Sequence, residues 1–150
     1  LVVVVLVMVG AALAPVGAQD ELPYTVNLGG NEALGTFLVG PNGMTLYTFL
    51  RDSLDTSNCA GPCLEAWPAL TVDSADALSK DEAIPGELGT ITRDDGALQV
   101  TYNGWPLYYW SRDAAPGDAT GHSDSLCGGQ CRARFLPGRL DGHDSLHLHQ

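Results

Sequence analysis

Basic residues are scarce in this chain of 150 residues. Seven Lys and Arg stand against 18 Asp and Glu, which gives a formal net charge of −11. Nucleic-acid binding depends on clustered Lys and Arg that neutralise phosphates, so the composition excludes a nucleic-acid partner. Hydrophobic residues make up 45% of the chain and charged residues 17%. This balance excludes a compositionally disordered protein.

Histidine is also rare, and its four copies lie at positions 122, 143, 147 and 149. The chain contains no nucleophile elbow, no phosphate-binding loop, no dinucleotide-binding glycine pattern and no His-Glu-x-x-His. Acid–base catalysis by histidine is therefore excluded before position 122. We predict that the protein is not an enzyme, and we assign no catalytic residue.

No hydrophobic run reaches the roughly 20 apolar residues that a membrane-spanning helix needs. The longest run fills positions 1–9, and Val16 and Ala18 place small residues where signal peptidase cuts. We predict a signal peptide over residues 1–18 with a truncated n-region; an uncleaved anchor is the alternative. After cleavage we expect no stable membrane span. The protein is then exported, and its location is the periplasm, the cell envelope or the extracellular space. The rest divides into a linker (19–33), a folded domain (34–121) and a Cys- and His-containing tail (122–150).

The four cysteines are too few for a dense disulfide framework. They form two close pairs, Cys59 with Cys63 and Cys127 with Cys131. Disulfides are favoured over free thiols in an oxidising compartment. Three connectivities exist, and the Gly and Pro residues between the members of each pair favour the local one. No Cys lies near the predicted cleavage site, so a lipidated N-terminal Cys is not expected.

The chain repeats itself at an offset of 61 residues. Residues 42–52 (NGMTLYTFLRD) align without a gap with residues 103–113 (NGWPLYYWSRD), and six positions are identical. Each copy predicts a β-hairpin, because Asn-Gly between apolar runs is a strong turn signal. The expected strands are 34–39, 44–50, 89–93, 97–102 and 107–111.

Helix is expected only in a single turn at 64–67 and a short segment at 74–83, each stopped by a proline. Two hairpins of this size cannot each bury a core alone. The predicted fold is therefore mainly β, with two related β-hairpin repeats packed into one small domain with little helix.

Alternation along the returning strands places two aromatic residues of each copy on one face. An Asp follows just past each strand end. We expect a buried Tyr hydroxyl bonded to a carboxylate to lock the strand-to-loop junction within each half. A symmetry-related catalytic carboxylate pair is the alternative. The motif residues, with a structural or a binding role, are Tyr47, Phe49, Asp52, Tyr108, Trp110 and Asp113.

These residues resemble a bacterial and archaeal family of secreted-repeat lipoproteins with the motif Tyr-x-aromatic-x-x-Asp. The segments Ser57-Asn58-Cys59-x-x-x-Cys63, Ala66-Trp67-Pro68 and Pro116-Gly-Asp118 agree with it in order. The resemblance covers residues 34–121 and implies a β-rich envelope or extracellular repeat whose biochemical role is unassigned.

The chain departs from the family pattern in two places. It has no Cys for lipidation after the signal, so only a lipoprotein-like description carries over. The resemblance also implies a Trp-containing closing strand after His122, which this sequence replaces with a Cys- and His-containing tail. The tail is either a genuine appendage or a reading-frame artefact. Loss of the closing strand would leave an unpaired sheet edge.

Two groups of residues are candidates for binding. Tyr102, Trp105 and Tyr109 either stack a ligand such as a sugar, quinone or haem, or belong to the core of the sheet. The tail spacing approaches a two-Cys, two-His zinc site, and its histidines also suit copper. The metal candidates are Cys127, Cys131, His143, His147 and His149, and a tail that binds no metal is the alternative.

The sequence thus predicts an exported β-repeat protein with a non-enzymatic binding or interaction role. Its partner would be an envelope protein or a small ligand, and no cofactor is required. The alternative is a redox- or metal-associated module that uses the aromatic residues and the tail.

Overall fold

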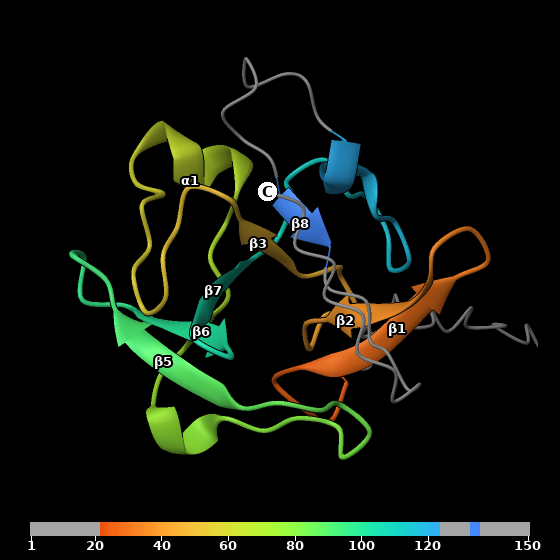
Figure 1. Cartoon of the computed structure of the whole chain (residues 1–150), viewed down its shortest axis with the longest axis horizontal. Helices are drawn as coiled ribbons and strands as arrows, with labels where there is room; N and C mark the ends of the chain where they lie inside the picture. The colour runs from red at the N-terminus through yellow and green to blue at the C-terminus, as the bar shows by residue number, and fades with distance from the viewer. Residues whose placement is uncertain (1–21, 124–132, 136–150) are drawn as a thin grey trace, which may run out of the picture.

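The computed structural model describes residues 22–123 and 133–135, and the chain there is mainly β, as predicted (Figure 1). The strands are β1 (Asn27–Asn31), β2 (Gly35–Val39), β3 (Tyr47–Phe49), β4 (Thr71–Val72), β5 (Leu88–Thr92), β6 (Leu98–Tyr102), β7 (Trp105–Tyr108) and β8 (Ala133–Phe135). β1 and β2 form a two-stranded sheet. The larger sheet has the order β4-β6-β7-β3-β8, and β5 also pairs with β6.

Both repeats begin with an antiparallel hairpin. β1 pairs with β2 from Asn27 opposite Val39 to Asn31 opposite Gly35, and β5 pairs in the same way with β6. β1 starts 61 residues before β5, which is the offset of the sequence repeat. Residues 27–31, expected as linker, are therefore a strand. Their sequence NLGGN has no β-branched residue, so the pairing with β2 rather than local propensity makes the strand.

The second repeat contains the Asn-Gly hairpin that its sequence predicts. β6 and β7 are joined by Asn103 and Gly104, and Tyr102 lies opposite Trp105. Asn103 has a φ of 49° and Gly104 a φ of 80°. Two successive positive φ values give the turn whose twist matches that of the flanking strands.

In the first repeat the corresponding hairpin is short. After a turn over 40–43 the returning segment pairs with β2 next to the turn, where Gly40 N donates to Met44 O (2.9 Å), Leu46 N donates to Leu38 O (2.9 Å) and Val39 bridges Thr45. β3 instead pairs antiparallel with β7 of the second repeat. The expectation that 44–50 returns along 34–39 is therefore confirmed only next to the turn, because β3 lies farther along between β7 and β8 in the sheet.

The last segment of each repeat lies against the other repeat. The segment after α1 (Pro62–Ala66) follows β7, where Tyr109 N donates to Pro68 O (2.8 Å) and Leu70 N to Leu107 O (3.0 Å). It continues as β4 along β6. In the opposite sense, β8 pairs with β3, with Phe135 opposite Tyr47. β8 thus covers an edge of β3, in the first repeat. The hairpin of the second repeat, whose edge the sequence suggested would be unpaired, is paired through β6 with β4 and β5 and through β7 with β3.

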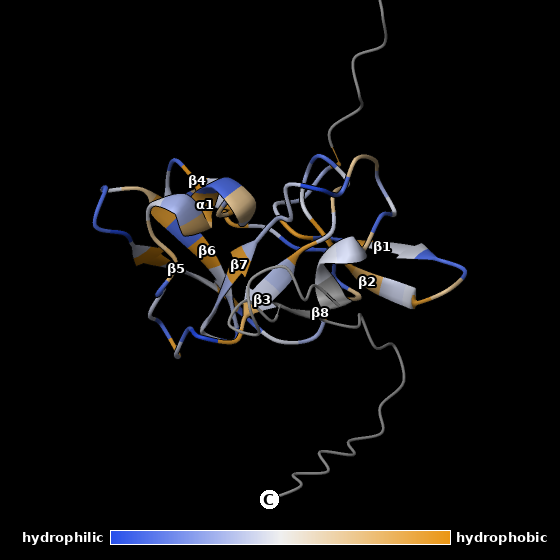
Figure 2. Ribbon diagram, turned by 90° about the horizontal axis from the view of Figure 1, so that it is seen from above, coloured by the Kyte–Doolittle hydropathy of each residue, from blue (hydrophilic) through white to orange (hydrophobic). Residues whose placement is uncertain are grey.

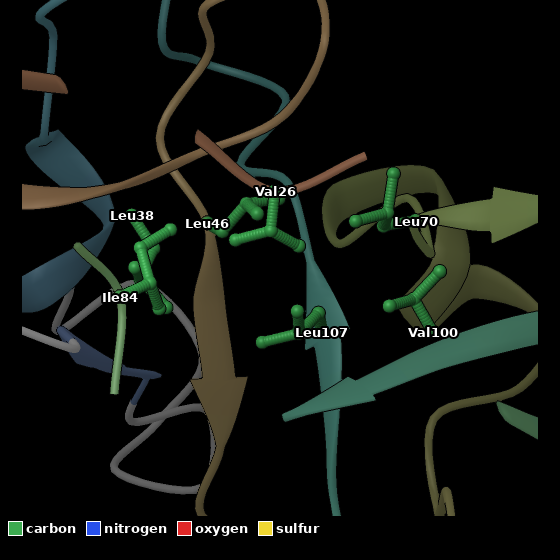
Figure 3. Close-up of a cluster of buried hydrophobic side chains, with 7 residues drawn as sticks. All are labelled: Val26, Leu38, Leu46, Leu70, Ile84, Val100 and Leu107. Atoms are coloured by element: carbon green, nitrogen blue, oxygen red, sulfur yellow. The ribbon is translucent and has the colours of Figure 1, made fainter. Parts of the chain in front are cut away.

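Apolar residues pack on both sides of the β3–β7 pair. One core holds Val26, Leu38, Leu46, Leu70, Ile84, Val100 and Leu107, drawn from both repeats (Figure 3). The other, which we call the aromatic cluster, consists of Tyr47, Phe49, Cys59, Trp67, Tyr108 and Trp110. Orange segments on β5, β6 and β7 alternate with paler or blue ones, while the connecting loops carry many of the hydrophilic residues (Figure 2).

Helix is limited to short pieces. α1 covers the turn expected at 64–67, whereas the segment expected at 74–83 contains only the 3₁₀ turn η1 (Ala75–Ala77). A second 3₁₀ turn, η2 (Thr120–Ser123), lies between β7 and β8. Within the described residues no helix has the length and apolar character needed to cross a membrane.

Candidate functional site

The repeated tyrosines meet at the centre of the molecule. Tyr47 on β3 lies directly opposite Tyr108 on β7, and both side chains are fully buried. Phe49 and Trp110 lie on the same side of the sheet, in the aromatic cluster. The face predicted from the period-two pattern is therefore confirmed, with Leu46 and Leu107 in the opposite core.

The two Tyr–Asp hydrogen bonds cross between the repeats. Tyr47 donates to Asp113 Oδ2 over 2.7 Å, and Tyr108 donates to Asp52 Oδ2 over 2.7 Å. The prediction that each half locks its own junction is wrong in this respect. Because β3 and β7 are antiparallel with the tyrosines in register, each hydroxyl lies near the end of the neighbouring strand. The motif therefore joins the repeats to each other.

At the Asp113 end the carboxylate is fully engaged by the backbone and by hydroxyls. Its Oδ1 accepts from Thr120 N (2.9 Å) and Thr120 Oγ1 (2.7 Å), while Oδ2 accepts from Tyr47. Gly121 N in turn donates to the Tyr47 oxygen over 3.2 Å. A buried carboxylate with several donors is stable without a cation.

The Asp52 end differs, since a buried arginine takes part. Asp52 Oδ1 accepts from Asn58 N (2.7 Å), and Ser57 Oγ lies 2.6 Å from the Tyr108 oxygen. Arg93 donates to Ser57 Oγ (2.9 Å), to Cys59 O (2.6 Å) and to the buried Gln99 side chain. A chain of donors thus runs from Arg93 through Ser57 and Tyr108 to Asp52.

Burial shifts the acid–base properties of these groups. It raises the pKa of Tyr108 from 10.0 to about 12, and the hydrogen bond to Asp52 acts in the same direction. Burial and the bond to Asp113 likewise raise the pKa of Tyr47 far above its ordinary value. The pKa of Asp52 is raised by burial, which outweighs the opposing bonds from Asn58 N and Tyr108 and the charge of Arg93.

Alkaline pH is therefore expected to destabilise the protein. Unfolded tyrosines ionise near pH 10, whereas buried Tyr108 and Tyr109 hold their protons until about pH 12. Their contribution is complete below pH 10 and is lost as the pH rises through the folded pKa, by about 1.4 kcal/mol per pH unit for each group. Denaturant unfolding across this range measures the loss, and Tyr108→Phe should make it shallower. A constant midpoint would contradict the prediction.

The carboxylates are not arranged as a catalytic pair. Asp52 and Asp113 follow antiparallel strands and lie toward opposite ends of the β3–β7 pair. Each is almost completely buried and accepts hydrogen bonds from its own set of donors. The two carboxylates are therefore better placed to hold the two repeats together than to act on a substrate.

A family model matches this duplicated arrangement. The Lipoprotein_15 model, described as a secreted repeat of unknown function, matches the chain twice, over residues 30–71 and 89–131. The chain belongs to this family. The first match begins in β1 and the second in β5, two residues apart at the repeat offset of 61, and each contains one copy of the Tyr–Asp motif. No curated protein and no solved structure matches the chain.

The family match extends across both cysteine pairs. Cys59 and Cys63 form a disulfide with a Cα–Cα distance of 5.3 Å, as the local pairing predicted. The disulfide and the secreted family agree with export. Cys127 and Cys131 fall within the second match, but they lie outside the described residues. His143, His147 and His149 lie beyond the match and also outside the described residues, so the predicted pairing and metal site stay predictions.

The three aromatic candidates for ligand stacking separate in the secreted-repeat fold. Tyr102 and Tyr109 are partly buried against the aliphatic core, and the Tyr102 hydroxyl donates to Pro85 O. The hydroxyl of Tyr109 lies close to Gly40, where a Cβ would collide with it. Trp105 alone of the three is classed as exposed. Ligand stacking thus remains a proposal for Trp105.

Sequence reasoning did not identify Trp67 and Arg93 as residues of the site. Trp67 packs on Trp110 with ring centroids 4.2 Å apart and on Tyr47 at 5.6 Å. The family segment Ala66-Trp67-Pro68 was the signal that could have found it. Arg93 follows β5 next to an acidic turn, which is typical of a solvated residue, and only the tertiary structure shows that it is buried.

Surface hollows border the repeats. One of about 320 Å³ lies beside Arg93, between the 55–61 loop and the 94–95 turn, and its rim carries Asp55, Asp94 and Asp95. Another of about 400 Å³ is lined mainly by glycines and apolar residues near β1 and Pro116. The first is the more polar of the two.

Proposed function

We propose that this secreted-repeat protein is a non-enzymatic binding domain of the envelope or the extracellular space. Its contact surface is the Trp105 patch, formed by Trp105 and Leu54. The supporting observation is that both large apolar side chains are exposed, and that Leu54 lies against Gly104, the residue before Trp105.

The Trp105 patch is held in place by the first repeat. Asp55 N donates to Gly104 O over 2.7 Å, and Leu54 lies so close to Gly104 that a Cβ there would be 3.1 Å from Leu54 Cδ2. Trp105 is 38% exposed and Leu54 60% exposed. Tryptophan is enriched at the centres of binding interfaces, because it brings a large rigid apolar area and a hydrogen-bond donor.

Charge next to the patch favours a basic partner. Asp55 both touches Gly104 and borders the polar hollow, whose far rim holds Asp94 and Asp95. The chain as a whole carries a net charge of −11. Opposite charge accelerates encounter and makes association weaken with salt. We therefore propose an envelope partner with a basic contact surface around an apolar centre.

Replacing Trp105 with alanine should abolish retention of partner while leaving the domain folded. The measurement is a pull-down from envelope extract of the producing cell at low and high salt, followed by denaturant unfolding of each variant. Tyr24→Ala is the matched control, since Tyr24 is also exposed (36%) and lies outside the Trp105 patch. Exposed substitutions usually change stability by no more than about 0.5 kcal/mol.

Two results would count against this function. One is equal retention by the wild type and Trp105→Ala. The other is an equal loss of partner retention in Trp105→Ala and in the control Tyr24→Ala, which would mean that the effect is not specific to the Trp105 patch. Unfolding of Trp105→Ala would show instead that Trp105 belongs to the core.

Metal binding by the tail is a separate prediction. Elemental mass spectrometry of the exported protein, purified without a His tag, should detect zinc or copper that is lost when His143, His147 and His149 become alanine. Ending the chain at Gly121 is a poorer test, because it also removes β8, which pairs with β3. Equal metal content in the wild type and the triple variant would exclude the tail site.

A further inference from the structure

We propose that the aromatic cluster is a one-electron relay, in which an oxidising equivalent entering at Trp110 passes through Trp67 to Tyr47, whose proton moves to Asp113. This activity is independent of the Trp105 patch. It assigns a role to the repeated Tyr–Asp motif beyond joining the two repeats.

The rings form a continuous path from the surface inward. Trp110 is 5% exposed, more than any other side chain of the aromatic cluster. It packs on Trp67 with centroids 4.2 Å apart and planes 31° apart, and Trp67 meets Tyr47 edge-on at 5.6 Å. Tryptophan and tyrosine are the side chains that an oxidant converts to radicals most readily in the absence of a free thiol. Contact between their rings allows an electron to move in short steps.

Two features direct the oxidising equivalent toward Tyr47. The Arg112 guanidinium lies 5.7 Å from the centre of the Trp110 ring, and its positive charge disfavours a radical cation there. Trp67 Nε1 is buried and has no hydrogen-bond acceptor among the described residues. Among the described residues an oxidised Trp67 therefore has no acceptor for its proton, and it takes an electron from Tyr47.

Tyr47 has the proton acceptor that Trp67 lacks. Its hydroxyl donates to Asp113 Oδ2 over 2.7 Å, in a fully buried bond. When Tyr47 loses an electron, its O–H becomes strongly acidic and the proton crosses to the carboxylate. The products are a neutral tyrosyl radical and a protonated Asp113. Reduction of the radical returns the proton along the same bond.

The electron balance requires an external one-electron oxidant. The oxidant is a high-potential radical or metal complex at the surface near Trp110. It gains one electron, Tyr47 supplies it, and the proton remains inside the protein on Asp113. The net charge of the buried Tyr47–Asp113 pair rises by one, through neutralisation of the carboxylate.

Tyr108 provides a matched control within the same molecule. It is buried like Tyr47 and donates to a carboxylate at the same distance. Its ring, however, meets Phe49 at 6.1 Å, and Phe49 separates it from Trp67. The relay therefore ends at Tyr47.

The test is flash photolysis of the full exported protein with tris(bipyridine)ruthenium(III) as the oxidant. Transient absorption and electron paramagnetic resonance follow the radicals. All proteins carry Tyr24→Phe, which removes an exposed tyrosine. We expect a tryptophan radical cation that decays into a tyrosyl radical, more slowly in deuterated water. Tyr47→Phe should lose most of the tyrosyl signal and prolong the tryptophan signal, while Tyr108→Phe should keep both as in the reference.

The relay is overturned by a tyrosyl yield in Tyr47→Phe equal to the reference, or by loss of the signal in Tyr108→Phe alone. A readout without a core substitution guards against misfolded variants. Electron–nuclear double resonance of the otherwise unaltered protein should detect two exchangeable deuterons hydrogen-bonded to the tyrosyl oxygen, one from protonated Asp113 and one from Gly121 N. A radical with a single such deuteron, or with none, would refute the role of Asp113.

Discussion

Replacing Trp67 with alanine is expected to lower the free energy of unfolding by about 3–5 kcal/mol. Trp67 is only 1% exposed and contacts the rings of Tyr47, Phe49 and Trp110. Its far edge also lies 3.0 Å from the position that a Cβ on Gly121 would occupy. Removing the indole leaves a cavity that rings held by strands on two sides cannot fill. Urea or guanidinium unfolding followed by circular dichroism measures the loss.

The matched control is Trp105→Ala, which removes the same side chain from an exposed position. It should change the free energy of unfolding by about 0.5 kcal/mol or less. Trp67→Phe should fall between the two, since it keeps part of the ring contact. Equal costs for the two alanine variants would mean that the aromatic cluster is not a packed core, and the relay would lose its basis as well.

The crossed Tyr–Asp bonds predict a specific pattern of coupling between substitutions. A double-mutant cycle of Tyr47→Phe and Asp113→Ala should give a coupling free energy of about 1.5–3 kcal/mol, as expected for a buried hydrogen bond to a charged group. The cycle of Tyr108→Phe and Asp52→Ala should give a similar value. Each is measured by denaturant unfolding of four proteins.

The control cycle pairs each tyrosine with the aspartate of its own repeat. Tyr47→Phe with Asp52→Ala should couple by no more than about 0.5 kcal/mol, because these residues share no bond. Stronger coupling within the repeats than between them would show that the hydrogen bonds do not cross. That result would also mean that the Tyr–Asp bonds do not make the stability of one repeat depend on the other.

Much of the local structure follows from the sequence. Asn103 and Gly104 favour positive φ, so the β6–β7 turn is readable without the structure. The alternation of Tyr47 and Phe49 with Leu46 fixes which side chains share a face, because the period of a strand is two. Cys59 and Cys63 are close enough in the chain for their pairing to be a local matter. β1 was not predicted, because Gly29 and Gly30 give its sequence little strand character.

Long-range partners could not be read in this way. The sequence determined that each repeat has a buried tyrosine and a following aspartate, since these depend on neighbours in the chain. Whether Tyr47 binds Asp52 or Asp113 depends on the antiparallel register of β3 with β7, which only the tertiary structure decided. The same holds for β8 against β3 and for the burial of Arg93. In a duplicated chain the two copies offer nearly identical partners, and packing between the repeats selects one of them.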